Sequence, residues 1–150
     1  MNGKELMVGD FVKFTDYDGD VYASLKVACV TDKNEVFLAD DEGTEFDLFR
    51  DEDLERVEPL MITKEFLEKN GFEERTRLRD LREYIKHVDH DELGRVSSGV
   101  LVTFFDAGTL IEAESRVLQF PKKIHLPLAP YIHQLQQTCR LCGIEIDWKL

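Results

Sequence analysis

Three clusters of turn-forming residues divide the first third of the chain and constrain its fold more than any other feature. They are Asp16–Asp20, Thr31–Asn34 and Asp40–Gly43. The segments between them are short, and their apolar residues fall largely on alternate positions, as in Val8–Phe14, which is typical of strands with one buried face. Closure into a small barrel removes the exposed edges that a short open sheet would leave. The sequence therefore predicts an SH3-like β-barrel over residues 1–58.

A short helix is predicted after Pro59, which ends the extended segment. Thr63 suits the N-cap, because its hydroxyl can accept a hydrogen bond from the first turn, and the neighbouring Ile62 can pack against Leu67. Gly71 can adopt the left-handed conformation that ends a helix. Residues 59–72 are therefore assigned as a linking helix.

The stretch from Glu73 to Glu92 favours one amphipathic helix, with an irregular strand as the alternative. Its leucine, isoleucine and valine residues recur at spacings of three, four and three, at Leu78, Leu81, Ile85 and Val88. Arginines would then occupy the solvent-facing side of the helix.

A small antiparallel sheet and a terminal helix are predicted for the rest of the chain. The β-branched and aromatic run Val100–Phe105 indicates a buried strand, Asp106–Gly108 its turn, and Thr109–Phe120 one or two returning strands. Pro130 suits the first turn of the last helix, where its missing N–H costs nothing. The predicted fold class is thus α+β, with residues 73–150 forming a subdomain in which the sheet packs with the C-terminal helix.

The terminal helix places two sets of side chains on different faces. One face is apolar and carries Ile132, Leu135, Cys139 and Cys142. The other is polar and carries His133, Gln136, Gln137 and Arg140.

Composition and the start of the sequence indicate a cytoplasmic protein. Residues 1–5 lack the basic and apolar regions of a signal peptide, and no later run approaches the roughly 18 apolar residues that a membrane span requires. The chain has 3 cysteines, an odd number that fits free thiols in a reducing compartment. No membrane interaction is therefore expected.

The net charge of −12 is concentrated in the N-terminal part, since residues 1–60 hold 17 acids and 6 bases while residues 61–150 hold 14 acids and 13 bases. An acidic field repels phosphate backbones, so direct binding of DNA or RNA is not expected. A basic protein partner, or solubility alone, is favoured.

Three segments have recognisable motifs: Val57–Leu67 closing on Asn70–Phe72, Tyr131–Gln136, and Leu6–Val12. They resemble an uncharacterised family of gut anaerobic bacteria and their phages or mobile elements. Val57–Leu67, closing on Asn70–Phe72, is similar to the family's "EPIPLTEEWLLKFGFE", and Tyr131–Gln136 is similar to its "YVHQLQNLYFALTGEEL". Leu6–Val12 resembles the family's opening "LRIGNWV". The chain departs from the family after Gln136 and around 75–99. The resemblance implies a similar architecture and a phage or mobile-element origin, and it brings no established activity.

Three motifs have the outline of metal or redox sites, and each has a simpler interpretation. Cys139 and Cys142 have CxxC spacing, but the family's matching positions are apolar or aromatic, which favours core packing over metal or redox chemistry. The run His87–Glu92 lacks further ligands at a convincing spacing and is interpreted as a solvated turn. Asp16–Asp20 has its glycine fourth and Val27 twelfth, unlike a calcium loop, and is interpreted as a hairpin turn. No metal or cofactor is predicted.

Two groups of polar residues are candidates for partner binding. His133, Gln134 and Gln136 can either read a partner through directional hydrogen bonds or satisfy buried backbone groups, with the structural role slightly favoured. The acidic residues of Asp40–Glu42 and Asp51–Asp53 can imitate a phosphate ladder or be simply solvated, and solvation is favoured. From these groups the tentative partner-binding residues are His133, Gln134, Gln136, Asp40, Asp41, Glu42 and Asp51.

The sequence contains no nucleophile elbow, phosphate-binding glycine loop or HExxH motif, so the protein is not expected to be an enzyme. We predict a non-catalytic protein-binding accessory factor of phage or mobile-element origin. Phe14, Tyr17 and Tyr22 are predicted to line a groove for an extended peptide, or else to fill the core. The alternative function is an acidic DNA-mimic inhibitor of a nucleic-acid enzyme.

Overall fold

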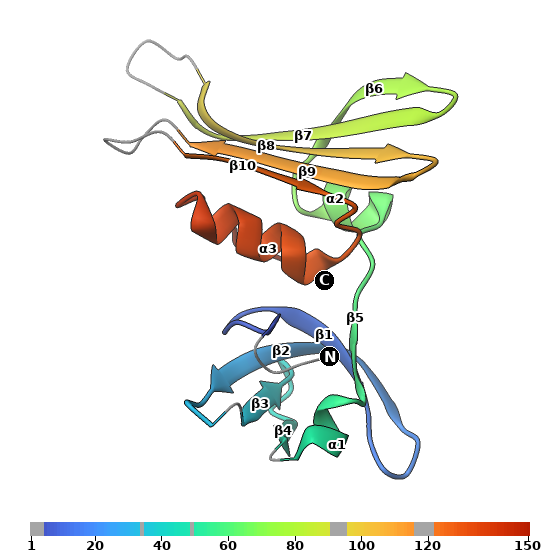
Figure 1. The fold of residues 1–150 in the computed structure, drawn as a ribbon, viewed down its shortest axis with the longest axis vertical. Helices are drawn as coiled ribbons and strands as arrows, with labels where there is room; N and C mark the ends of the chain where they lie inside the picture. Colours follow the sequence, from blue (N-terminus) through green and yellow to red (C-terminus); the bar gives the residue numbers. More distant parts are fainter. Residues whose placement is uncertain (1–4, 34, 49, 91–95, 116–121) are drawn as a thin grey trace. The chain divides into compact units, whose positions relative to one another are not determined.

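The protein has an α+β fold with two antiparallel sheets, seen in a computed structural model that describes residues 5–33, 35–48, 50–90, 96–115 and 122–150 (Figure 1). The chain forms two compact units. The N-terminal unit comprises residues 1–61 with 131–133, and the C-terminal unit comprises residues 62–130 with 134–150. The first unit therefore ends at Met61, whereas the sequence prediction ended the N-terminal module at Glu58. Residues 62–72 of the predicted linking helix belong to the C-terminal unit.

The N-terminal unit contains a five-stranded sheet with the order β4-β3-β2-β1-β5. Its strands are β1 (Phe11–Thr15), β2 (Val21–Val30), β3 (Val36–Ala39), β4 (Glu45–Leu48) and β5 (Val57–Pro59). The short helix α1 (Asp51–Leu54) lies between β4 and β5. Every pairing in this sheet is antiparallel, and the recorded pairings leave β4 and β5 at opposite edges.

Alternation of apolar side chains builds the core of the N-terminal unit, as the sequence predicted. Its buried residues include Val12, Leu25, Val27, Val36, Leu38 and Val57. The turns are closed by local hydrogen bonds: Asp16 Oδ1 accepts from the backbone N–H groups of Asp18 and Asp20, both at 2.9 Å. Asp16–Asp20 is thus a hairpin turn, as predicted. Of the two roles predicted for Phe14, lining a groove or filling the core, the structure shows the second.

The C-terminal unit contains a five-stranded meander with the order β10-β9-β8-β7-β6. Its strands are β6 (Glu73–Leu78), β7 (Leu81–His90), β8 (Val96–Phe105), β9 (Gly108–Ser115) and β10 (Lys122–Pro127). The helices are α2 (Lys64–Lys69) and α3 (Ile132–Leu141), of which residues from Gln134 onward belong to this unit. The predicted returning strand over Thr109–Phe120 is β9, and residues 116–120 of the predicted segment lie outside the described residues. The strand β10 follows after that segment and was not predicted.

The helix favoured over residues 73–92 is wrong, and the alternative of strand holds, because β6 and β7 form a hairpin over residues 73–90. Residues 91–92 lie outside the described residues. The apolar spacing of three and four matched a helix, but β6 pairs with β7, and β7 also pairs along almost its whole length with β8. Tyr84 and Ile85 are residues that favour strands, and both adjacent strands give them residues to pair with. Long-range pairing therefore overrides the helical periodicity.

The helix α2 begins and ends as its sequence predicted. The Thr63 hydroxyl accepts from the Phe66 N–H at 3.2 Å, and Gly71 adopts the left-handed conformation with a φ of 76°. Phe72 folds back, its N–H donating to the Leu67 carbonyl at 3.0 Å. The C-terminal segment packs beside this helix, where Trp148 stacks on Phe66 and Phe72 with ring centroids 5.8 and 6.2 Å apart.

The two faces of the larger sheet differ in what covers them. Val100 and Val102 on β8 and Ile111 and Ala113 on β9 alternate into one buried face. The Cys142 thiol, just beyond α3, donates to the Ala113 carbonyl at 3.3 Å. In the described part of the chain, α2 and α3 lie on the same side of this sheet (Figure 1). We call the opposite side the outer face; its apolar residues are Leu81, Ile85, Leu101, Phe105 and Leu110.

Candidate functional site

The polar side chains that the sequence placed on α3 are buried or half-buried. His133 is 6% exposed and Gln136 is 1% exposed, while Gln134 is half-buried. Thr138 is also buried, and its hydroxyl donates to the Gln134 carbonyl at 2.7 Å. The side chains of both predicted faces of α3 are thus buried or half-buried.

His133 is a buried imidazole in the N-terminal unit. Its ring stacks on Tyr131 with centroids 5.7 Å apart, and its Nδ1 has no hydrogen-bond partner among the described residues. Burial lowers the pKa of His133, and the negative charges of Asp10 and Glu5 oppose this only in part. The ring is therefore held neutral in the folded protein.

We expect this imidazole to make the protein less stable in mild acid. The unfolded chain takes up a proton near the ordinary histidine pKa of about 6.5, whereas the folded protein binds it only at lower pH. The free energy of unfolding should thus fall as the pH drops through 6.5 toward the lower folded pKa. His133→Phe keeps the stacked ring but removes the titration, so its urea midpoint should fall less between pH 7.5 and 5. Parallel midpoint curves for the two proteins would contradict the prediction.

The CxxC cysteines are buried in the C-terminal unit. Cys139 and Cys142 are both 0% exposed, and burial, followed by the proximity of Cys142, raises the pKa of Cys139 to about 12. Within the described residues, no group of three or more histidine, cysteine, aspartate or glutamate side chains is arranged to hold a metal ion. The motif His87–Glu92 extends into residues 91–92, which lie outside the described part of the chain.

Thiol labelling should distinguish these cysteines from Cys29, which is exposed on β2. Because the thiolate is the reactive form, the native protein should give one rapidly labelled thiol with a disulfide reagent, and all 3 after denaturation. In Cys29→Ser the rapid phase should disappear. Rapid labelling that persists in this variant would show that the CxxC thiols are accessible.

The acidic cluster Asp51–Asp53 lies on α1 and contacts the β1–β2 turn of the N-terminal sheet. Tyr17, at the tip of the β1–β2 turn, donates its hydroxyl to the carboxylate of Asp53 on α1. The Arg56 guanidinium lies 4.1 Å from the centre of the Tyr17 ring and donates to the Asp16 carbonyl at 2.9 Å. These contacts bring the acids of α1, including the exposed Asp51, close to the acids of the turn.

The second acidic cluster lies in the β3–β4 turn. Asp40 Oδ1 accepts from the backbone N–H groups of Thr44 at 2.7 Å and Glu42 at 3.0 Å. The hydrogen bond from Thr44 is the largest cause that lowers the pKa of Asp40. Asp41 and Glu42 are exposed beside it. Asp40 therefore shapes the turn, and its neighbours remain open to solvent.

The outer face of the larger sheet contains a hollow that the sequence did not predict. Gly99 lies opposite His87 on β7 and Glu114 on β9, so the middle of the sheet lacks a side chain at this point. The hollow has a volume of about 300 Å³ and is lined in part by Ile85, His87, Gly99, Leu101, Glu112 and Lys123. No signal short of the strand register could have predicted it.

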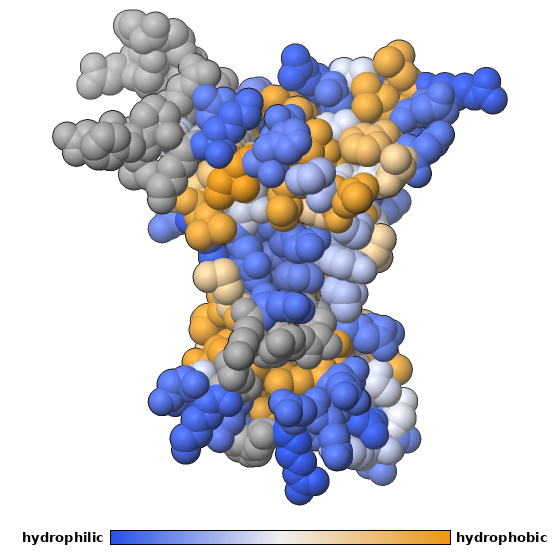
Figure 2. Space-filling model, in the orientation of Figure 1, coloured by the Kyte–Doolittle hydropathy of each residue, from blue (hydrophilic) through white to orange (hydrophobic). Residues whose placement is uncertain are grey.

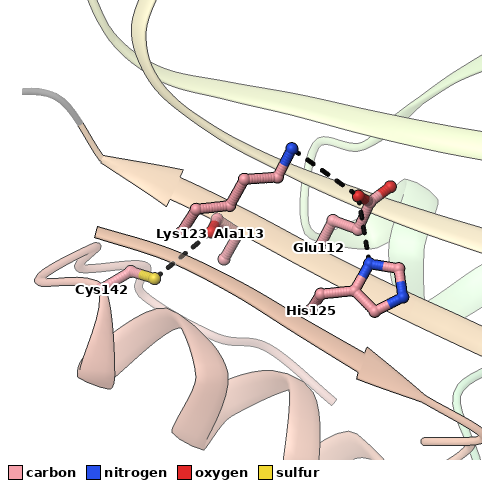
Figure 3. A network of polar contacts seen from close by, with 5 residues as sticks. All are labelled: Glu112, Ala113, Lys123, His125 and Cys142. Carbon is pink, nitrogen blue, oxygen red and sulfur yellow. Dashed lines mark hydrogen bonds and ion pairs between the residues drawn. The ribbon is translucent and has the colours of Figure 1, made fainter. Parts of the chain in front are cut away.

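Charged side chains border this hollow on the β9 and β10 strands. Glu112 Oε1 lies 3.3 Å from His125 Nδ1 and 3.9 Å from Lys123 Nζ (Figure 3). Cys142 reaches Ala113 from the α3 side of the same pair of strands (Figure 3). The outer face thus combines an apolar floor with an ionic border, and apolar and hydrophilic residues lie side by side on the visible surface of the C-terminal unit (Figure 2).

Comparisons with known proteins returned no matching protein-family model, no matching curated protein and no matching solved structure. Among the described residues, no helix combines the length and the apolar composition needed to cross a bilayer.

Proposed function

We propose that this protein is a non-catalytic binding factor that holds a protein partner on the outer face of its larger sheet. The observation that carries the proposal is the composition of β8, the central strand. Its inward residues Val100 and Val102 are buried, yet Leu101 and Phe105 on the outward side are also apolar. A solvated face of an antiparallel sheet normally alternates to polar residues, so an apolar outer face indicates an interaction surface.

The chemistry of the face favours a partner segment that is apolar with basic residues around it. Ile85 and Leu101 form an apolar floor beside the hollow, while Glu83, Glu112 and Glu114 belong to the same face. An apolar centre with a polar rim is the usual anatomy of a protein interface. The three glutamates would also attract the basic residues of such a partner.

The strand order of the N-terminal unit supports an SH3-like barrel as the finer description of its fold. In such barrels the first strand pairs with both the second and the last, as β1 does with β2 and β5. The helical turn α1 before the last strand is consistent with this arrangement. The motifs Val57–Leu67 and Tyr131–Gln136 support the further proposal of a phage or mobile-element origin.

A pair of lysine variants tests the binding proposal. Leu101→Lys places a charge on the outer face, where Glu112 lies opposite and can pair with it, so the fold should tolerate the change. Val21→Lys makes the same change at an exposed apolar residue of the N-terminal unit and is the matched control. A partner isolated with the wild-type protein would be identified and purified, and its dissociation constant measured with all three proteins.

The proposal expects Leu101→Lys to weaken binding at least tenfold and Val21→Lys to leave it within twofold, which corresponds to about 1.4 kcal/mol or more for the first change. Equal binding by Leu101→Lys, or no enriched partner at physiological salt, would reject the outer face as the binding surface. Circular dichroism of both variants checks that the sheets remain folded.

The proximity of α1 to the β1–β2 turn favours a second candidate, an acidic inhibitor that mimics DNA. The contacts between Tyr17 and Asp53 hold the acids of both segments at one end of the N-terminal unit. Such an inhibitor should bind a basic nucleic-acid enzyme with an affinity that falls steeply with salt. Neutralising Asp40, Asp41 and Asp51 to asparagine should then abolish binding, and an unchanged affinity would dismiss this function.

A further inference from the structure

A second pocket lies at the turn end of the larger sheet, apart from the hollow on the outer face. The β6–β7 turn, the end of β8 and the first residue of α2 enclose a volume of about 350 Å³. Its walls include Lys64, Arg79, Arg82, Tyr84, Phe104 and Asp106. This volume falls at the lower end of the roughly 300–1,000 Å³ that is usual for small-molecule sites.

Cationic groups outnumber acids around this pocket, although the protein as a whole is strongly acidic. Lys64, Arg79 and Arg82 line it, against Asp80 and Asp106. The guanidinium groups of Arg79 and Arg82 have no hydrogen bond or ion pair with a described residue. The Lys64 ammonium forms an ion pair with the Glu68 carboxylate at 3.5 Å, and ion pairs between exposed side chains such as these contribute little to stability. All three cations are therefore available to a ligand.

The hydroxyl of Tyr84 is an independent indication that this region can bind a polar group. The residue is 1% exposed, and its hydroxyl has no hydrogen-bond partner among the described residues. A buried hydroxyl without a partner costs about 1–3 kcal/mol. Burial is the largest cause that raises the pKa of Tyr84, so the phenol remains a protonated donor. Lys64 and Arg82 lie close enough to oppose that rise through their charges.

The apolar part of the wall is aromatic. Phe104 meets the Tyr84 ring edge to face, with centroids 5.8 Å apart. Flat hydrocarbon groups pack well against such rings. The pocket thus offers cations and a hydroxyl donor beside an aromatic surface.

We propose that this pocket binds a small organic anion, with a carboxylate or phosphate group joined to a flat apolar body. The guanidinium of Arg82 has the forked geometry that matches two oxygens of either anion, and Lys64 adds a second positive charge. The Tyr84 hydroxyl donates to the same anionic group, and the body of the ligand lies against Phe104. This site does not depend on protein binding at the outer face.

Two aromatic anions and a neutral isostere provide the test, and two-dimensional amide NMR of the 150-residue chain follows their binding. Benzoate and phenyl phosphate should shift amides of residues 79–84 and 104–106 at millimolar concentrations, and their relative affinities show which anionic group is preferred. Benzamide should bind at least tenfold more weakly than benzoate, and inorganic phosphate more weakly than phenyl phosphate. Equal binding of benzamide, or no localised shifts with either aromatic anion, would overturn the proposal.

Three variants separate recognition of the anion from folding. Arg82→Gln should weaken binding of the preferred anion at least tenfold, while Arg77→Gln on the adjacent strand β6, which does not line the pocket, should leave it unchanged. Tyr84→Phe should weaken binding several-fold while leaving stability unchanged or higher, because it removes a buried hydroxyl without a partner. Binding that is unaltered in Arg82→Gln would overturn the assignment.

Discussion

Replacing Leu135 with alanine is expected to cost about 2–5 kcal/mol of unfolding free energy, the usual penalty for emptying a fully buried leucine site. Leu135 is 0% exposed on α3, in the C-terminal unit. The loss combines the transfer of the side chain out of the core with the cavity that it leaves. Urea unfolding followed by the fluorescence of Trp148, the only tryptophan and a residue of the same unit, measures it.

Leu141→Ala is a matched control, because Leu141 ends the same helix but is 55% exposed. An exposed substitution away from special features usually changes stability by less than about 0.5 kcal/mol. The pair of variants therefore compares the same chemical change at two levels of burial. Similar costs at the two positions would show that α3 does not pack with the face predicted by its apolar spacing.

Asn70→Asp should destabilise the C-terminal unit by about 3 kcal/mol at neutral pH. The Asn70 amide donates to the carbonyls of Phe66 and Lys149 and accepts from the Lys149 N–H, each at 2.8 Å. A carboxylate keeps the accepted bond but turns both donated bonds into contacts between oxygens. The penalty should shrink in acid, since a protonated carboxyl can again donate a hydrogen bond.

Lys149→Ala is the control for this prediction, because Lys149 contributes only its backbone to Asn70. Its unfolding midpoint should match that of the wild-type protein. In Asn70→Asp, Trp148 should also leave its stack on Phe66 and Phe72, which a red shift of its emission would report. Emission that stays native in the variant would mean that other contacts hold the C-terminal segment in place.

The local features of this fold were predictable from sequence, and the long-range ones were not. Thr63 and Gly71 set the bounds of α2 through hydrogen bonds to near neighbours, so their residue types sufficed. The strand β7 was predicted as a helix because its preference depends on β8, a partner that comes later in the chain. Residues close in sequence can specify a helix cap or a turn, whereas strand pairing depends on the strand that lies alongside in the folded sheet.

The same distinction applies to the candidate sites. The acidic turns were recognisable, since Asp40 and Asp16 act on backbone groups only a few positions away. The burial of Gln136 was only one of two alternatives, because an amide side chain can either satisfy buried backbone groups or bind a partner. The pocket beside Tyr84 gathers residues from two turns and a helix, and their proximity exists only in the folded sheet.

The pairing pattern of the two sheets bears on the order in which the protein folds during synthesis. Each strand of the larger sheet pairs with its neighbours in sequence, so that sheet can grow by successive hairpins with short loop closures. The N-terminal unit also includes residues 131–133, and Ile132 donates its N–H to the Leu60 carbonyl at 2.8 Å. Although its strands emerge first from the ribosome, this unit is completed only when residues near the end of the chain have been translated.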